Sequence, residues 1–330
     1  LSQSDRNIDA MSTSVAAIEG LDANEDAILR VLCRREGRDP ANFADLDAVA
    51  ADQGFVQAIA ARQESSKILA RSSKASSAAG QSTVAVEELA KSDTAIAEFV
   101  VSSNIMQGVA ASQTAMQELR SSQTAMPVLA ASQTAMTEID QVDFAVRAIM
   151  CGTTSLDPTS FADADAISQD AAAMSEIVGD ATTMNTLAAS QTAMATVAAS
   201  QTAMQEVAAS QTAMQAVANT QTAVNEIGNN ATVVNTVYNS STAIDELSNS
   251  SLTEYKADYF QDTGRTISLK NDRTILLAHD VGYRGEASNQ PLFGASDSSL
   301  PQTADRIRRF ANNTYYEGTT TSATYIDISG

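Results

Sequence analysis

The sequence is poor in the bulky side chains from which most globular cores are built. Its 330 residues include no tryptophan, eight phenylalanines and seven tyrosines. Aromatic side chains each bury a large apolar area, so a single compact core of this size would normally contain more of them. Alanine, serine, threonine and glutamine fill long stretches instead, which favours thin, closely approaching elements over one large sphere.

Cysteine and histidine are also scarce. Two cysteines, Cys33 and Cys151, are too few for a disulfide framework, and each lies in an apolar run, which indicates a buried free thiol. The single histidine, His279, has no second histidine or thiol cluster near it in the sequence. We therefore expect neither a metal site nor a general base at His279.

Signatures of nucleotide binding and nucleophilic catalysis are missing as well. The sequence has no phosphate-binding glycine loop, nucleophile elbow or dinucleotide fingerprint. The pairs Asp45/Asp47 and Asp163/Asp165 match neither a calcium loop nor a catalytic carboxylate pair, and we interpret them as solvated helix faces. The sequence thus predicts no catalytic residue, no cofactor-binding residue and no metal site, and hence a protein that is not an enzyme.

Acidic residues outnumber basic ones, 40 to 20, and lysine is rare among the latter. The formal net charge of −20 argues against a nucleic-acid partner, because binding phosphates requires Lys and Arg to displace counterions. Such a surface suits a high-salt habitat, where salt screens self-repulsion, and it equally suits an ordinary soluble acidic protein. No apolar run approaches the roughly 18 residues of a membrane-spanning helix, so no membrane insertion is expected.

Self-similarity is the main positive feature of the sequence. A decapeptide with the core SQTAMxxVAA repeats without insertion, and its apolar position three residues after Met runs from Ile59 to Ile139 and again from Ile177 to Leu247. Nearly every decad also carries a capping residue (Ser, Asp, Thr or Asn) four places before the Met position. A period held over so many residues defines a repeat protein.

Each decad is expected to form one short helix followed by a turn. In a continuous helix ten residues advance about 1000°, so the apolar stripe would slip by about 80° per decad and no partner helix could follow it. A β-solenoid is disfavoured because Ala, Met, Gln and Glu prefer helices. We expect the Met and Val columns to be buried, with Gln and Glu outside.

Two residues of each decad are candidates for the start of the helix. One is the Ser four places before Met, and the other is the Thr two places before it. The Thr would place Pro127 in a first helical turn, where a missing N–H is tolerated. It would also form capping boxes with Gln in the pairs Thr114/Gln117, Thr202/Gln205 and Thr212/Gln215.

A larger duplication overlies the decads. The segment 27–59 recurs 118 positions later as 145–177, so the chain holds two modules, each a helical head followed by an array of decads. In both heads an Asp-Pro pair predicts an N-cap followed by Pro at the first helical position, and a glycine predicts the end of the preceding helix. These residues are Asp39, Pro40 and Gly37 in the first head, and Asp157, Pro158 and Gly152 in the second.

The two ends of the sequence differ from the arrays. Leu1, Ile8, Met11, Val15 and Ile18 fall on heptad positions and predict a short coiled coil or a single amphipathic helix. After residue 250, alternating patterns predict strands at 266–269, 274–277 and 314–328, the first two joined by a turn at 271–272. The predicted fold is mainly α and fibrous, with four domains: an N-terminal coiled-coil attachment segment (1–20), two head-plus-array modules (21–140 and 141–250) and a small β-rich tip (251–330).

The aromatic residues of the predicted tip are candidates for a carbohydrate- or protein-binding surface, and equally for the core of that domain. The candidate receptor-contact residues are Tyr259, Tyr283, Tyr315, Tyr316 and Tyr325. Acceptor sequons for N-glycosylation occur at Asn230, Asn239, Asn249 and Asn312, in a segment so rich in Asn, Ser and Thr that chance explains most of them.

The DPxxFADxDAV heads and the SQTAMxxVAAS arrays resemble the stalks of tail fibres and related attachment proteins of tailed viruses of bacteria and archaea. The resemblance covers about 27–250 and does not extend to the tip. The resemblance implies an extracellular virion fibre that is a homotrimer and is held at its N-terminal end by other tail or baseplate proteins. The C-terminal end would contact a host surface glycan or protein, and the acidic composition favours a virus of a halophilic archaeon.

Two other classes stay open on the sequence. A cellular surface adhesin would share the repeats, and a polysaccharide-degrading tailspike would need a β-helical body with a carboxylate pair. We also expect several copies, most simply three, to pack together, because one or two small apolar residues per turn would bury too little surface within one chain. With one layer per decad, seventeen decads would give a stalk of about 150 Å.

Overall fold

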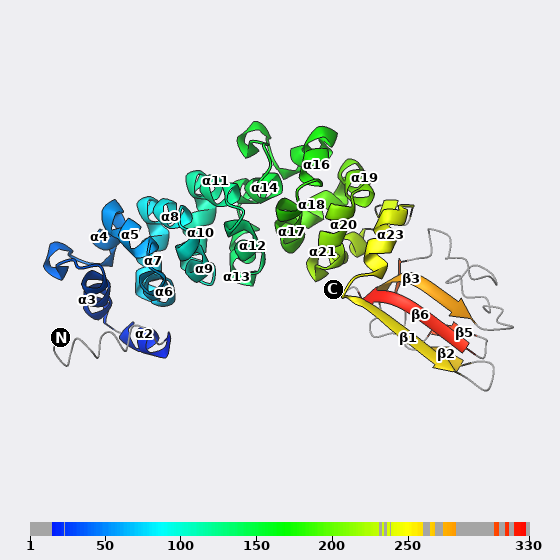
Figure 1. Cartoon of the computed structure of the whole chain (residues 1–330), viewed down its shortest axis with the longest axis horizontal. Coiled ribbons are helices and arrows are strands. Elements are labelled where there is room, and N and C mark those ends of the chain that lie inside the picture. Colours follow the sequence, from blue (N-terminus) through cyan, green and yellow to red (C-terminus); the bar gives the residue numbers. More distant parts are fainter. Residues whose placement is uncertain are drawn as a thin grey trace. The chain divides into compact units, whose positions relative to one another are not determined.

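The computed structural model describes residues 15–22, 24–230, 233, 236, 237, 239–259, 265–267, 273–281, 307–309, 314–316 and 320–327. Contacts divide the chain into two units, Leu1–Asp163 and Ala164–Gly330. Most of the described residues are helical, which confirms the mainly α fold (Figure 1). The predicted coiled coil falls largely on residues 1–14, outside the described residues, and only α2 (Val15–Leu21) is seen there.

Short helices make up the first unit. After α2 they are α3 (Glu25–Arg35), the 3-10 helix η1 (Pro40–Asn42), α4 (Leu46–Ala51), α5 (Gln53–Ala60), α6 (Gln63–Arg71), α7 (Ser73–Gln81), α8 (Thr83–Ala90), α9 (Asp93–Phe99), α10 (Ser103–Ala111), α11 (Gln113–Ser121), α12 (Ala125–Ala130), α13 (Gln133–Ile139), α14 (Asp143–Cys151) and η2 (Pro158–Ser160).

The second unit continues in the same way and then turns to strands. Its helices are α15 (Ala164–Gln169), α16 (Ala171–Ile177), α17 (Ala181–Ala189), α18 (Gln191–Ala199), α19 (Gln201–Ala209), α20 (Gln211–Ala218), α21 (Gln221–Asn229) and α23 (Ser241–Ser248). Its strands are β1 (Thr253–Tyr259), β2 (Arg265–Ile267), β3 (Arg273–Val281), β4 (Ile307–Arg309), β5 (Thr314–Tyr316) and β6 (Thr320–Asp327).

Each decad within the described residues 52–229 forms one helix, and in most of them the side chain four places before the Met position caps it; Arg62, Ser102 and Thr220 stand there without a cap hydrogen bond. Ser200, for example, has an extended backbone (φ −97°, ψ 117°), and its Oγ accepts a hydrogen bond from the backbone N–H of Ala203 at 3.2 Å. The alternative start was wrong: Thr114, Thr202 and Thr212 lie inside their helices as the second helical residue, so they form no capping boxes. The extended cap residue is what turns the chain sharply between successive helices.

Pro127 explains the one decad in which the helix starts late. It lacks the N–H that would close the first turn onto the carbonyl of Gln123, so α12 begins at Ala125 rather than at Gln123. The hydroxyl of Ser122 still accepts hydrogen bonds from the backbone N–H groups of Thr124 and Ala125, at 3.2 and 3.0 Å. Pro127 thus lies in the first turn, as expected, although the Thr124 side chain makes no cap hydrogen bond.

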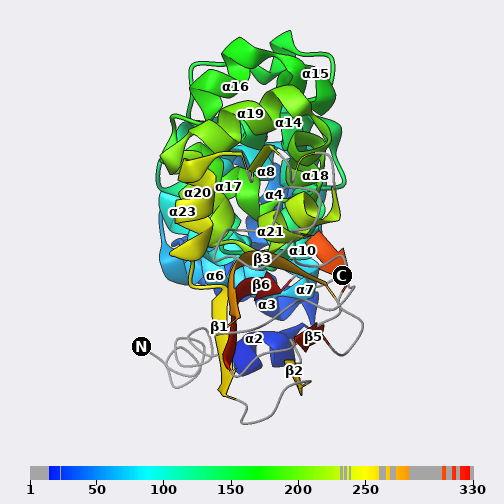
Figure 2. The same cartoon turned by 90° about the vertical axis from the view of Figure 1, so that its right-hand side faces the viewer.

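Helices stack on the third helix along the chain, so that three decads complete one turn of a solenoid. In the first unit α5 packs on α8, α8 on α11 and α11 on α14, and these helices follow one another in Figure 1. Two further columns run α6–α9–α12 and α4–α7–α10–α13. The second unit repeats the pattern with α15–α18–α21, α16–α19 and α17–α20–α23, and Figure 2 shows these columns on three sides. The expectation of one layer per decad was therefore wrong: a layer takes three decads.

The core lies inside the triangle of helices. Counting the cap residue as position 0, the residues at positions 3, 4, 7 and 8 point inward; in α19 they are Ala203, Met204, Val207 and Ala208, all buried. The Met and Val columns are buried as expected, and two alanine columns complete the core. Because all four columns are buried within a single chain, burial of these residues gives no reason to expect several copies.

Hydrogen bonds between turns form a ladder along the solenoid. Among the described residues, eight side chains at the cap position donate to a backbone carbonyl 32 residues earlier, one turn back. Ser82 donates to Ala50 (2.7 Å), Ser92 to Ala60 (2.6 Å), Ser132 to Val100 (2.6 Å), Ser200 to Ser168 (2.7 Å), Ser210 to Val178 (2.8 Å), Asn230 to Ala198 (2.7 Å), and Ser240 and Ser250 to Ala208 and Ala218. We call this set the cap ladder.

A second set of bonds joins the outer surfaces of successive turns. The residue after the cap donates to a glutamate at position 6 of the helix one turn later, 35 residues on: Gln53 to Glu88 (2.7 Å), Gln63 to Glu98 (2.9 Å), Gln191 to Glu226 (3.3 Å) and Gln211 to Glu246 (2.8 Å). Glu88 also binds Lys91 at 2.9 Å and is only 7% exposed. With Glu138, which accepts from Ser103 and is also buried, it is an exception to the expected exposure of glutamate.

The heads follow their predicted local signals. Asp39 and Asp157 cap the turns that begin with Pro40 and Pro158, although these turns are 3-10 rather than α-helical. Gly37 and Gly152 end the preceding helices with positive φ angles of 66° and 45°. This left-handed backbone is strained for residues with a Cβ, which is why glycine stands there.

One pair of stacked helices approaches unusually closely. A Cβ on Gly80 of α7 would lie 2.0 Å from the carbonyl oxygen of Asn104, and one on Gly108 of α10 would lie 2.0 Å from that of Gly80. The backbones of α7 and α10 therefore touch directly, which only glycine permits at these two positions.

The strands pair differently from the sequence prediction. The sheet order is β1-β6-β3-β4, with β2 and β5 forming a separate two-stranded ladder, and all pairs are antiparallel. The expected hairpin between 266–269 and 274–277 was wrong, because β2 pairs with β5 and β3 pairs with β4 and β6. Residues 271 and 272 lie outside the described residues.

Candidate functional site

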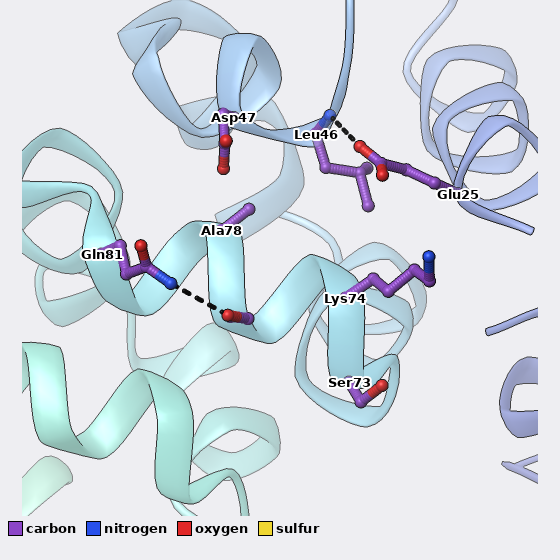
Figure 3. A pocket seen from close by; sticks show the side chains of 8 residues that line it. Glu25, Leu46, Asp47, Ser73, Lys74, Ala78 and Gln81 are labelled. Carbon is purple, nitrogen blue, oxygen red and sulfur yellow. Dashed lines mark hydrogen bonds between the residues drawn. The ribbon is translucent and has the colours of Figure 1, made fainter. Parts of the chain in front are cut away.

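A polar cavity of about 330 Å³ lies between α3, α4 and α7 in the first unit (Figure 3). It is lined by Glu25, Leu46, Asp47, Ser73, Lys74, Ser77, Ala78 and Gln81. Glu25 accepts a hydrogen bond from the backbone N–H of Leu46 at 3.1 Å, and Gln81 donates to the hydroxyl of Ser77 at 3.0 Å. Lys74 extends from α7 toward the side of the cavity formed by α3 (Figure 3).

The carboxylates around this cavity hold helix ends and neighbouring backbone. Asp45 caps α4 through the backbone N–H of Ala48 at 2.8 Å, and Asp47 lies in the first turn of that helix. Asp22 accepts from the Ser72 hydroxyl at 2.5 Å and from the Ser73 backbone N–H at 2.7 Å. These carboxylates therefore act as caps, which is a structural role.

Asp22 takes the place of a carbonyl of the cap ladder at the first turn. Burial raises the pKa of its carboxyl group, but the hydrogen bonds from Ser72 and Ser73 outweigh burial and hold this pKa below its ordinary value. The ionised carboxylate accepts the Ser72 hydroxyl, as a backbone carbonyl does for Ser82 in the next helix. A carboxylate stabilised in this way is a poor proton donor or acceptor near neutral pH.

A second, apolar groove of about 530 Å³ lies at the corner between α9 and α12. It is lined by Val100, Val101, Pro127, Val128, Ala131, Ser132, Gln133 and Thr134, none of which is charged. Among the described residues, two large apolar side chains are exposed, Val84 and Val101, and Val101 is the more exposed of the two, at 41%. The groove suits apolar contact and offers no group for acid–base chemistry.

The two cysteines are unsuited to nucleophilic chemistry. Both are buried, and they form no disulfide with one another. Burial, reinforced by the charge of Asp39, raises the pKa of the Cys33 thiol to about 11. A thiol is reactive as its thiolate, so Cys33 stays protonated and inert at neutral pH.

Neither a metal cluster nor a membrane span emerges from the described residues. Within them, no three His, Cys, Asp or Glu side chains are placed to hold a metal ion together. Nor does any described helix combine the length and apolar character needed to cross a bilayer.

The candidate receptor-contact tyrosines occupy separate places in the strands. Tyr259 ends β1 opposite Thr320, and Tyr325 on β6 stands opposite Glu254 of β1. Tyr315 and Tyr316 lie in β5, which belongs to the other sheet. Tyr283 lies outside the described residues. His279 is on β3 opposite Ala323. The receptor-contact surface stays a prediction.

Sequence reasoning found the cap residues but missed their second role. The signal was present, because hydroxyl or amide caps predominate within the arrays, whereas aspartate caps the decads that directly follow each head (Asp52, Asp170 and Asp180). A carboxylate accepts a hydrogen bond from its own helix but has no proton to donate to the turn before. Only caps that join one turn to another need such a proton.

The fold therefore defines a class: an α-solenoid repeat protein with three short capped helices per turn. Comparison with models of protein families and with curated proteins found no match for this chain.

Proposed function

We propose that this protein is a structural, non-enzymatic fibre subunit of a tailed virus, in which the solenoid spaces a C-terminal host-attachment region from an anchored N-terminal part. The observation that carries the proposal is the cap ladder, in which residues such as Ser200 and Ser210 both start a helix and tie it to the turn before. Repeats held in this way build a stiff spacer whose length follows the number of turns.

The geometry of the solenoid sets the scale of the spacer. Each turn of three decads adds roughly 8–10 Å, the usual distance between packed helices. This is about a third of the length expected from one layer per decad. A solenoid is consequently shorter and thicker than the predicted stalk, and bends less easily for a given length.

The proposed partners follow from the resemblance to tail fibres. Tail or baseplate proteins would hold the N-terminal part, and a host surface glycan or protein would bind the strand-rich C-terminal region. Association of three copies is also taken from that resemblance, since the core columns are already buried in one chain. The tailspike alternative requires a β-helical body, whereas the repeats form α-helices. The alternative of a cellular adhesin requires the same architecture, so only the location of the protein distinguishes an adhesin from a viral fibre.

Location is the direct test. Antibodies raised against the array would be applied with gold labels to purified virus particles and to envelopes of the cells that produce them. We expect gold on particle appendages, and the chain should be found by mass spectrometry in particles banded in a density gradient. Gold on uninfected cell envelopes with none on particles would refute the viral role and favour the adhesin.

A second assay tests attachment and the absence of enzymatic activity together. The purified chain is expected to slow adsorption of the particles to host cells by competing for the receptor. It should release no soluble sugar from host surface polysaccharide. Release of oligosaccharides would overturn the non-enzymatic assignment, and unchanged adsorption at saturating protein would overturn the attachment role.

A further inference from the structure

The last two corners of the second array combine an asparagine just before the cap with a serine just after it. The residue just before the cap is alanine at Ala189, Ala199 and Ala209, and asparagine at the four following corners, Asn219, Asn229, Asn239 and Asn249. The residue just after the cap is glutamine at Gln191, Gln201, Gln211 and Gln221, and serine at Ser241 and Ser251. Only at these two corners do the asparagine and the serine occur together, and each such pair makes an Asn-Ser-Ser sequon.

The fold explains why these positions are free to change. In α18 and α20, Gln191 and Gln211 donate to glutamates one turn further on, which ties successive turns together. A residue at 241 or 251 has no array helix one turn later, because β1 begins at Thr253. The position after the cap is thereby released from its structural role in the last turn.

The two asparagines are presented to solvent with free amides. Asn239 and Asn249 are exposed at the ends of successive decads, and within the described residues neither side-chain amide has a hydrogen-bond partner. Ser241 and Ser251, which complete the sequons, are exposed as well. The middle residues Ser240 and Ser250 donate inward to Ala208 and Ala218, so their hydroxyls do not obstruct the acceptor amides.

Asn230 begins a third sequon, Asn-Ala-Thr, in a different setting. Its Nδ2 donates to the carbonyl oxygen of Ala198 at 2.7 Å, as a member of the cap ladder, and its Oδ1 faces the backbone N–H of Val233 at 3.4 Å. The nitrogen that would receive the sugar is therefore engaged between two turns, and the Asn230 side chain is half-buried rather than presented to solvent. Asn312, the fourth sequon, lies outside the described residues.

We propose that Asn239 and Asn249 are N-glycosylation sites and that Asn230 is not. In the transfer, Nδ2 of the asparagine forms a bond to the anomeric carbon of a sugar phosphate donor. The bond between that carbon and the phosphate oxygen breaks, the phosphate leaves with the electron pair, and the amide loses one proton. The donor is a sugar activated by phosphate, carried either by a nucleotide or by a lipid. A glycan here is compatible with a virion fibre and with an adhesin, so this proposal is independent of the proposed function.

Peptide mass spectrometry tests the proposal on the full chain purified from its natural source. The stretch 148–255 contains no Lys or Arg, so cleavage after glutamate is used; it yields the peptides 227–246 and 247–254. We expect sugar mass on Asn249 in the second peptide and on Asn239 in the first, with Asn230 distinguished by fragmentation. A single hexose indicates a nucleotide-linked donor, and a preassembled oligosaccharide indicates a lipid-linked one.

Matched variants made in the producing organism separate glycosylation from other changes at asparagine. Ser241→Ala and Ser251→Ala keep both asparagines but destroy the sequons, and both serines are exposed, so the fold is retained. Each variant should lose the sugar from its own site alone. Unmodified Asn239 and Asn249, sugar that persists in the serine variants, or sugar on Asn230 would each overturn the proposal.

Discussion

Ser210 allows the two roles of a cap residue to be weighed separately. Its Oγ accepts from the backbone N–H of Ala213 at 3.2 Å and donates to the carbonyl oxygen of Val178, one turn back, at 2.8 Å. Loss of an N-cap costs about 1 kcal/mol, and loss of a buried hydrogen bond costs about 1 kcal/mol more. We therefore expect Ser210→Ala to lower the free energy of unfolding by about 2 kcal/mol.

Ser112 supplies the matched control. Its hydroxyl accepts from the backbone N–H of Ala115 at 3.2 Å and, among the described residues, forms no bond to the turn before. Ser112→Ala should therefore cost only the cap, about 1 kcal/mol. Ser210→Asp gives a third comparison, because it keeps the cap acceptor but places a carboxylate against the Val178 carbonyl.

Urea unfolding followed by far-UV circular dichroism measures all three variants, with native-state hydrogen exchange to detect local opening of a repeat array. The expected order of stability is Ser112→Ala above both Ser210 variants. If Ser210→Ala and Ser112→Ala cost the same, or if Ser210→Asp matches the natural chain, the cross-turn bond contributes nothing and the cap ladder is an incorrect description.

Three further predictions concern packing, pH and register. Gly80→Ala forces α7 and α10 apart and should cost about 1–3 kcal/mol in thermal unfolding, whereas Gly20→Ala, with nothing within 4 Å of its Cβ, should be neutral; equal effects would refute the close approach. Burial raises the pKa of the Glu88 carboxyl group, but the hydrogen bonds from Lys91, Gln57 and Gln53 outweigh burial and lower this pKa overall. Ionised Glu88 therefore stabilises the fold fully above the ordinary carboxyl pKa, and this stabilisation is lost as pH falls through the lowered pKa. Glu88→Gln should flatten this acid dependence of the urea midpoint, and an unchanged slope would count against it. Deleting 191–220 removes one turn and should leave a folded chain more stable than deletion of 201–210, which moves every later helix to another column; the reverse order would contradict a three-decad turn.

The sequence predicted each helix well because the signals for a helix are local. The cap serine, the Met four residues later and the apolar residue three beyond it are all contained in one decad, and Ser200, Met204 and Val207 occupy the predicted places. The Asp-Pro and Gly signals of the heads are equally local, since Asp39 and Gly37 act within a few residues of themselves.

The number of helices per turn could not be predicted from the repeat period. A ten-residue repeat is compatible with two, three or four helices in a turn, because the angle between successive helices depends on the backbone of the cap residue and on packing. Counting only Met and Val as core also left out the alanine positions, such as Ala203 and Ala208, and led to the unnecessary packing argument for several copies. The strand pairing failed for a similar reason: β3 pairs with β6, far along the chain, and no local turn signal reports such a contact.

The candidate site was less predictable than the fold. The polar cavity joins Glu25, Asp47 and Lys74 from three helices that only the stacking brings together. The apolar groove depends on Val101, at a position that other decads fill with polar residues, alanine or glycine, a departure that an alignment of decads does reveal. No sequence motif marks the residues that line either pocket, so the sequence offered no reason to single these residues out.

A distance between Asn185 and Gln215 tests the three-decad turn most directly. Both residues are exposed, on the stacked helices α17 and α20, and they are 30 positions apart in the sequence. Spin labels would be attached at cysteines introduced there, with Cys33 and Cys151 replaced by alanine. Stacking predicts backbones roughly 8–10 Å apart and strong dipolar broadening of the spectrum. A separation of about 45 Å, the rise of a continuous helix over this stretch, or of about 27 Å, three layers of one decad each, would contradict it.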